Sequence, residues 1–152
     1  MQTTSLESAS RSELELALGE RINALLSATR VLSERSAAQF HPSLQPAAFH
    51  IARWLYAFGA ARPSVIAEAV GMDRSSTSTL IGSMRKLGLL DGEPDPEDRR
   101  SIIVSLSTSG RERVAAVLED RGLEFSRRTE GWSDDDLGRL VELLDRLVGT
   151  SS

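Results

Sequence analysis

The sequence predicts a mostly helical α+β fold, and three observations predict it. Apolar residues recur at helical spacing in most of the chain, proline and glycine divide these segments, and one stretch after residue 88 alternates with period two. The chain has 152 residues, of which 40% are hydrophobic and 26% charged. A chain of this length and composition folds as one compact domain without a disulfide or metal.

The composition excludes several kinds of chemistry. Because there is no cysteine, disulfides, thiolate zinc sites and thiol catalysis are excluded. No apolar run approaches the ~20 residues of a membrane span, and no signal peptide is recognisable at the start. We therefore expect a cytoplasmic protein with no membrane partner. We also expect no enzyme, cofactor or metal site, because no nucleophile elbow, phosphate-binding glycine loop or His-rich spacing is present.

The first predicted helix spans about residues 11–38 and is amphipathic. Residues 1–10 before it are polar, and we expect them to be disordered. The helix ends before His41 and Pro42, and a linker continues to residue 45. Its apolar positions recur every three or four residues: Leu14, Leu18, Ile22, Leu25 and Leu32.

Two shorter helices follow, each opened by a proline. Pro46 suits the first turn of the second helix, and Gly59 ends it. Pro63 opens the third helix, and Gly71 ends it as a C-terminal glycine does. We expect these apolar residues inside: Phe49, Ile51, Ala52, Leu55 and Phe58 on the second helix, and Val65, Ile66, Ala67 and Val70 on the third.

A fourth helix over residues 74–87 is predicted from its two ends. Asp73 is a good N-cap, and Gly88 is a stop. One side of this helix is expected to pack: Thr77, Leu80, Ile81, Met84 and Leu87. The other side carries small and polar residues that are free to contact a partner: Ser75, Thr79, Gly82, Ser83 and Lys86.

The segment after Gly88 predicts a β-hairpin. Residues 89–93 form the first predicted strand, and residues 101–107 form the second, with Ile102, Val104 and Leu106 on its apolar face. Between them lies a charged tip, residues 94–100, whose prolines favour a turn.

Two more helices complete the chain. Ser109 and Glu112 have the spacing of a capping box for the fifth helix, and Ser133 with Asp136 begins the sixth. The sixth helix carries a stripe of aliphatic residues: Leu137, Leu140, Val141, Leu144, Leu147 and Val148. We divide the chain into residues 11–45, 46–107 and 108–150 on this basis.

The order of elements from residue 63 to residue 107 is typical of a winged helix-turn-helix. The second helix of this motif enters the DNA major groove by its N-terminal end, where hydroxyl side chains contact phosphates or bases. The net charge is −4, but no acid lies between Arg74 and Leu90. The predicted DNA contacts on this helix are Arg74, Ser75, Ser76, Ser78, Thr79, Ser83 and Lys86.

The predicted tip carries Arg99 and Arg100 side by side. Arginine on a thin hairpin reaches the narrow minor groove, where the negative potential is concentrated. Asp98 beside them either holds an arginine side chain through an ion pair or caps the turn, and both roles stay open. The other acids of the hairpin are expected to face away from DNA or to pair with arginine: Glu93, Asp95 and Glu97.

Residues 63–111 resemble the MarR family of transcriptional regulators. The resemblance rests on the helix start at residues 73–76, the wing motif at residues 98–100, the segment at residues 105–107 and Gly110. It implies that the first, fifth and sixth helices are long N- and C-terminal dimerisation helices. It also implies that Arg100 probes the minor groove while Asp98 braces it.

The resemblance further implies a function. Members are sequence-specific DNA-binding regulators, mostly repressors, that bind as homodimers to inverted repeats in double-stranded DNA. Many release DNA when a small aromatic or anionic effector binds. Thr79, Gly82, Asp91 and Glu93 depart from the usual family residues, which favours readout of DNA shape through the wing.

Two alternatives remain open at this stage. A winged helix can also serve protein–protein contacts without specific DNA binding, although the polar helix start and the Arg-bearing wing favour DNA. Trp54, Tyr56 and Phe58 fit core or dimer packing, but the same rings beside Arg53 would also suit a ligand pocket.

Overall fold

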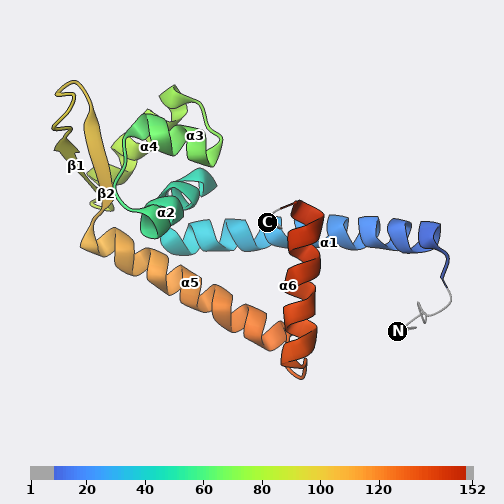
Figure 1. The fold of residues 1–152 in the computed structure, drawn as a ribbon. Helices are drawn as coiled ribbons and strands as arrows, with labels where there is room; N and C mark the ends of the chain where they lie inside the picture. Colours follow the sequence, from blue (N-terminus) through green and yellow to red (C-terminus); the bar gives the residue numbers. More distant parts are fainter. Residues whose placement is uncertain (1–8, 150–152) are drawn as a thin grey trace. The chain divides into compact units, whose positions relative to one another are not determined.

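The computed structural model describes residues 9–149, which contain six α-helices and one two-stranded antiparallel sheet (Figure 1). The predicted mostly helical α+β class is confirmed. The chain divides between Val114 and Ala115 into two compact units. The disorder expected for residues 1–8 and the last predicted helical residue, 150, lie outside the described residues. None of the described helices has the length and apolarity needed to cross a bilayer.

The first helix, α1, runs from Arg11 to Phe40, two residues beyond its predicted end. Ser10, which the sequence placed in a disordered start, is its N-cap. The Ser10 hydroxyl accepts the Glu13 N–H at 3.3 Å, and the Glu13 carboxylate accepts the Ser10 N–H at 2.7 Å. These reciprocal bonds satisfy two of the free donors at the helix start. Only the C-terminal end of α1 contributes buried residues: Ser36, Ala37 and Phe40.

The helices α2 (Pro46–Phe58) and α3 (Pro63–Val70) begin at the predicted prolines. They end at Gly59 and Gly71, both with positive φ, a conformation that costs glycine little because it has no Cβ. On α2, Phe49 packs against Phe40 of α1 with ring centroids 5.8 Å apart.

Two residues expected inside these helices are exposed. Phe58 is 73% exposed because it lies at the C-terminal end of α2, beyond the last packed turn. Val65 is 46% exposed because α3 buries a narrow face made by Ile66 and Ala67.

The fourth helix, α4, spans Arg74–Lys86 and is capped by Asp73 as predicted. Thr77, Leu80, Ile81 and Met84 are buried, which confirms the predicted packing face. The prediction for Leu87 was wrong, since this residue is 44% exposed. Leu87 is the C-cap of α4. The chain leaves the helix at this residue, so the Leu87 side chain does not lie on the packing face.

The hairpin pairs β1 (Leu90–Pro94) with β2 (Ile102–Leu106). β1 is displaced by one residue relative to the prediction, so that Pro94 belongs to β1 rather than to the turn. β2 is shorter than predicted by one residue at each end. Ala61, just before α3, also bonds to β2 through two backbone hydrogen bonds with Val104, at 2.8 and 3.0 Å. This contact joins the hairpin to the helix-turn-helix.

The fifth helix, α5 (Thr108–Arg128), begins two residues earlier than the predicted cap implies. Ser107, not Ser109, caps it: the Ser107 hydroxyl accepts the Gly110 N–H at 3.0 Å and donates to the Gly88 carbonyl at 2.6 Å. The start of α5 is fixed by its close approach to the end of α4. A Cβ at Gly110 would lie 2.1 Å from the Leu89 carbonyl oxygen.

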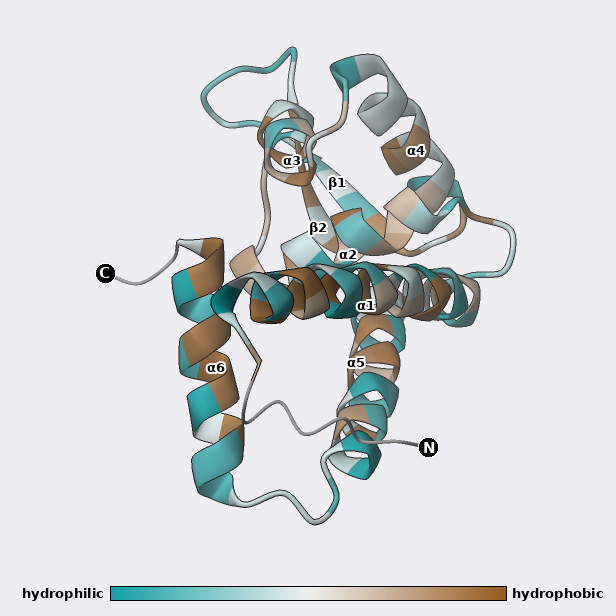
Figure 2. Ribbon diagram, turned by 90° about the vertical axis from the view of Figure 1, so that its right-hand side faces the viewer, coloured by the Kyte–Doolittle hydropathy of each residue, from teal (hydrophilic) through white to brown (hydrophobic). Residues whose placement is uncertain are grey.

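The second unit contains the rest of α5 and α6 (Asp134–Val148). Ser133 caps α6 as predicted, and its hydroxyl accepts the Asp136 N–H at 3.1 Å. No residue of α6 is buried, although apolar residues recur along its length (Figure 2). Those that are exposed include Leu140, Val141, Leu143, Leu144, Leu147 and Val148.

Candidate nucleic-acid interface

The N-terminal end of α4 is fixed by Asp73. The Asp73 carboxylate accepts the Ser76 N–H at 2.8 Å, and this hydrogen bond lowers the pKa of Asp73. The side chain of Asp73 is therefore ionised at neutral pH and holds the first turn of α4. The helix presents its remaining free backbone N–H groups, and the positive end of its dipole, toward solvent.

Hydroxyl side chains cover the exposed face of α4. Ser75, Ser76 and Ser78 are exposed, and their hydroxyls form no hydrogen bond within residues 9–149. The Thr79 hydroxyl donates to the Ser75 carbonyl at 3.0 Å, and the Ser83 hydroxyl donates to the Thr79 carbonyl at 3.2 Å. The three serines are thus available as donors, whereas Thr79 and Ser83 present acceptor lone pairs. Arg74 and Lys86 are exposed at the two ends of the helix.

A shallow groove of about 340 Å³ runs beside this face. Four predicted contacts line it together with Ser43 and Gln45 from the α1–α2 loop: Ser75, Ser76, Thr79 and Ser83. The loop residues could not be predicted from the sequence, because nothing in their local pattern shows that the loop lies beside α4.

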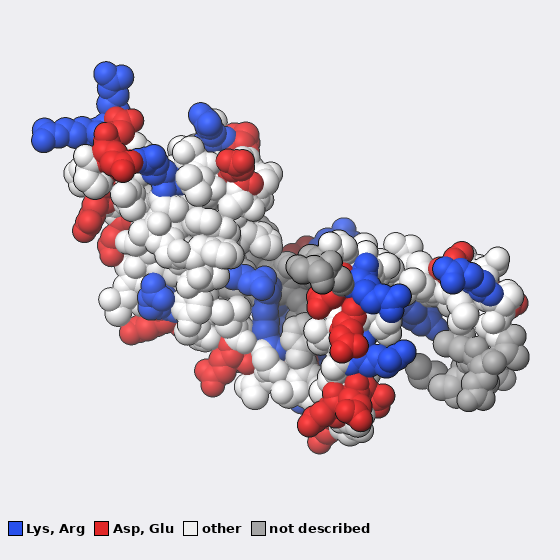
Figure 3. All heavy atoms as spheres, viewed as in Figure 1, with Lys and Arg blue, Asp and Glu red and all other residues white. Residues whose placement is uncertain are grey.

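The tip of the hairpin is a closed turn. The Ser101 N–H donates to the Asp98 carbonyl at 2.9 Å, and the Asp98 side chain accepts the Arg100 N–H at 3.0 Å. Of its two expected roles, Asp98 therefore caps the turn. Within residues 9–149 it forms no ion pair with Arg99 or Arg100, both of which are exposed. Basic side chains extend beyond the acidic ones at the outer end of the hairpin (Figure 3).

Arg62, the N-cap residue of α3, ties the hairpin tip to the helix-turn-helix. Its Nε donates to the Asp95 carboxylate, and its Nη2 donates to Glu97 at 2.9 Å. Asp95 is only 1% exposed. Its hydrogen bond with Arg62 lowers the pKa of the Asp95 carboxyl.

Arg62 thus pairs with two acids of the tip, as expected, and offsets part of their negative charge. Arg62 could not be found from the sequence, because an ion pair between distant residues leaves no periodic signal.

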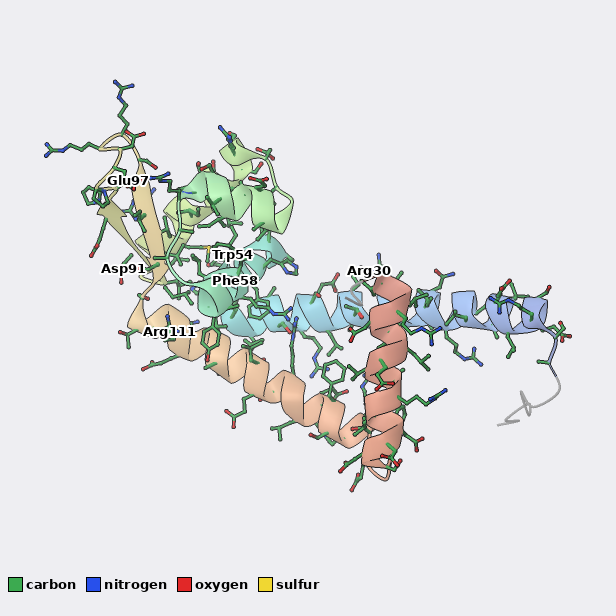
Figure 4. All side chains as sticks on the ribbon, viewed as in Figure 1. Arg30, Trp54, Phe58, Asp91, Glu97 and Arg111 are labelled. Atoms are coloured by element: carbon green, nitrogen blue, oxygen red, sulfur yellow. The ribbon has the colours of Figure 1, made fainter. Side chains whose placement is uncertain are left out.

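The aromatic residues of α2 form a separate feature. Trp54 and Phe58 lie side by side on α2 with ring centroids 5.2 Å apart (Figure 4). They line an open groove of about 500 Å³ with His50 and Arg53. Among residues 9–149, no three His, Asp or Glu side chains gather in an arrangement that could hold a metal ion.

Two helices joined by a tight turn, with a hairpin bonded beside them, make a winged helix-turn-helix. Residues 43–101 match the sequence model described as the MarR family. Over these residues the chain is similar to the MarR family.

The curated relatives of this chain have similar names. An uncharacterised HTH-type transcriptional regulator of Bacillus subtilis, YkoM, is 26% identical over 66% of this chain and 66% of its own length. Another from Mycobacterium leprae, ML2140, is 36% identical over 41% of this chain and 44% of its own length. The chain thus spans just under two thirds of the first relative and less than half of the second.

Solved structures resemble this chain over most of its length. RV1404 from Mycobacterium tuberculosis has a TM-score of 0.72 and 27% identity, and the match covers 86% of this chain and 92% of RV1404. YusO from Bacillus subtilis has a TM-score of 0.75 and 19% identity, covering 94% and 100%. The likeness to YusO shows that the two chains share a fold. In this chain, that fold includes a winged helix-turn-helix.

Proposed function

We propose that this chain is a DNA-binding transcriptional regulator of the MarR family. One observation carries the proposal: the same compact unit presents a hydroxyl-covered start of α4 and an Arg-bearing hairpin tip, and Arg62 ties that tip to α3. These are the parts that a winged helix uses in the major and minor grooves. The names of the curated relatives, HTH-type transcriptional regulators, support the same function.

We further propose that the chain acts as a homodimer. Several aliphatic residues of α6 are exposed to solvent, and α1 adds several more: Leu14, Leu16, Leu18, Leu25 and Leu26. Removing such surfaces from water is favourable by about 25 cal/mol per Å², so a stripe of this length favours association. Two copies would present two α4 helices to one duplex.

A homodimer with two-fold symmetry matches an inverted-repeat operator. We propose repression as the mode of regulation and relief by a small aromatic or anionic effector, both as the family resemblance implies. The Trp54–Phe58 groove with Arg53 supports an effector of that chemistry. A cytoplasmic location is part of the same proposal.

The experiment that tests the function is binding to the DNA upstream of the chain's own gene. Fluorescence anisotropy would follow a labelled duplex at a series of salt concentrations. We expect tighter binding to this duplex than to a scrambled one, with affinity falling steeply as salt rises because counterions are released. The alternative function, a module for protein contacts alone, predicts no binding to either duplex.

A further inference from the structure

The guanidinium group of Arg85, at the end of α4, lies over Gly92 of β1. A Cβ built at Gly92 would lie 2.8 Å from Cζ and 2.9 Å from both Nε and Nη2 of Arg85. Any side chain at position 92 would therefore displace the guanidinium. The glycine provides the space in which this arginine rests against the hairpin.

Arg85 and Arg100 line the same cleft between α4 and the hairpin. The cleft has a volume of about 300 Å³, and three hydroxyl residues also line it: Ser64, Ser78 and Ser101. No acidic residue among residues 9–149 lines it. Within the part of the chain that the structure describes, neither arginine forms an ion pair. Two unpaired cations and several hydroxyl donors thus surround one open space.

The acidic residues of β1 do not neutralise this cleft. Successive side chains of a strand point to opposite faces. Because position 92 faces Arg85, Asp91 and Glu93 point to the other face, and both are exposed. The negative charge of β1 is therefore directed away from the arginines.

We propose that this cleft binds a backbone phosphate of DNA, and that Arg85 is a DNA contact in addition to the predicted ones. This inference rests on the proposed function. Guanidinium groups bind phosphate oxygens through paired N–H donors, and hydroxyls add further donors. Phosphate contacts fix the register of a protein on the duplex without reading sequence. Arg85 would hold α4 and the hairpin at a set position on the DNA backbone.

The test is a comparison of salt dependence among variants at positions 85 and 92, measured on the preferred and on a scrambled duplex. Arg85→Ala is expected to weaken both complexes equally and to lower the slope of log K against log salt by about one per arginine removed. Arg85→Lys keeps the charge and is expected to keep the slope. Arg139→Ala, an exposed arginine of α6, is the control and should leave the slope unchanged.

Gly92→Val tests the position of the guanidinium. It is expected to weaken binding severalfold in the parent chain and to have no further effect in the Arg85→Ala background, since the displaced group is then absent. Circular dichroism would confirm that each variant is folded.

The outcomes separate the two proposals. A parent chain that binds no duplex overturns both the proposed function and this inference. A parent chain that binds DNA, with an unchanged slope for Arg85→Ala, overturns the phosphate cleft alone. An equal effect of Gly92→Val with and without Arg85 would also contradict it.

Discussion

The guanidinium of Arg62 donates to the buried carboxylate of Asp95, although the two residues are 33 positions apart in the sequence. Arg62 is the N-cap of α3, and Asp95 is the first residue of the hairpin tip after β1. This ion pair therefore fixes the hairpin against the helix-turn-helix. The same arginine holds Glu97. It also offsets part of the negative charge of these two acids, which would otherwise repel phosphate near the tip.

Replacing Arg62 should therefore affect DNA binding without removing a contact. We expect Arg62→Ala to lower affinity for the preferred duplex about tenfold while leaving the salt slope close to that of the parent chain, because no phosphate contact is lost. Anisotropy at several salt concentrations would measure both quantities. Arg53→Ala, an exposed arginine of the next helix back, is the matched control. A slope reduced by one or more would show instead that Arg62 touches the phosphates.

The same pair predicts an acid-sensitive hairpin. The folded-state pKa of Asp95 lies below its usual value of about 3.9. Its contribution to stability is therefore complete above that value and is lost as the pH falls through the lowered pKa. We expect the protection of amides at residues 95–101 from hydrogen exchange, taken relative to the intrinsic rate at each pH, to fall below about pH 4 in the parent chain. In Asp95→Asn, this protection should already be low at neutral pH and should change little on acidification.

Arg100 is predicted to contact the minor groove. Arg100→Ala should weaken specific binding by about 1–3 kcal/mol and reduce discrimination between the preferred and the scrambled duplex. Competition titrations at moderate salt would measure this. Unchanged affinity would remove Arg100 from the interface.

Replacing each of two helical glycines by alanine should change the free energy of unfolding in opposite directions. Gly110→Ala should destabilise the chain by at least about 1–3 kcal/mol, because the new Cβ would meet the Leu89 carbonyl at 2.1 Å and the backbone would have to move. Gly82→Ala has open space and should stabilise α4 by up to about 1 kcal/mol. Urea denaturation gives both values. A neutral Gly110→Ala would mean that α5 does not approach the end of α4 so closely.

The aliphatic stripe of α6 predicts the oligomeric state. Leu144→Asp should convert a dimer to monomers at micromolar concentration, because an unpaired charge would be buried in the interface. Arg139→Asp places the same side chain at a polar position of α6 and should remain dimeric. Sedimentation would distinguish the species, and a dimeric Leu144→Asp would show that α6 does not form the interface.

Local signals predicted most of the fold. The starts of α2, α3 and α4 follow from Pro46, Pro63 and Asp73, because each of these residues acts on the backbone within one helical turn. The exposed hydroxyl face of α4 followed from its helical period. The sequence could not predict contacts between distant segments. The bond between Ala61 and Val104 and the use of Ser107 as a cap both depend on how the hairpin packs.

The residues of the candidate site divide in the same way, into those that local sequence predicts and those that depend on contacts between distant segments. Ser75, Thr79 and Ser83 could be placed on an exposed face from sequence, because helix geometry alone decides it. The roles of Arg62 and of Arg85 over Gly92 could not, since each depends on a segment brought close only by folding.

Hydrogen exchange of the full chain, with and without the duplex it prefers, tests the central claim most directly. We predict that DNA slows amide exchange in two segments, residues 74–79 at the start of α4 and residues 98–101 at the hairpin tip. Protection confined to α1 and α6, or no protection at saturating DNA, would contradict the claim that the winged helix holds the duplex.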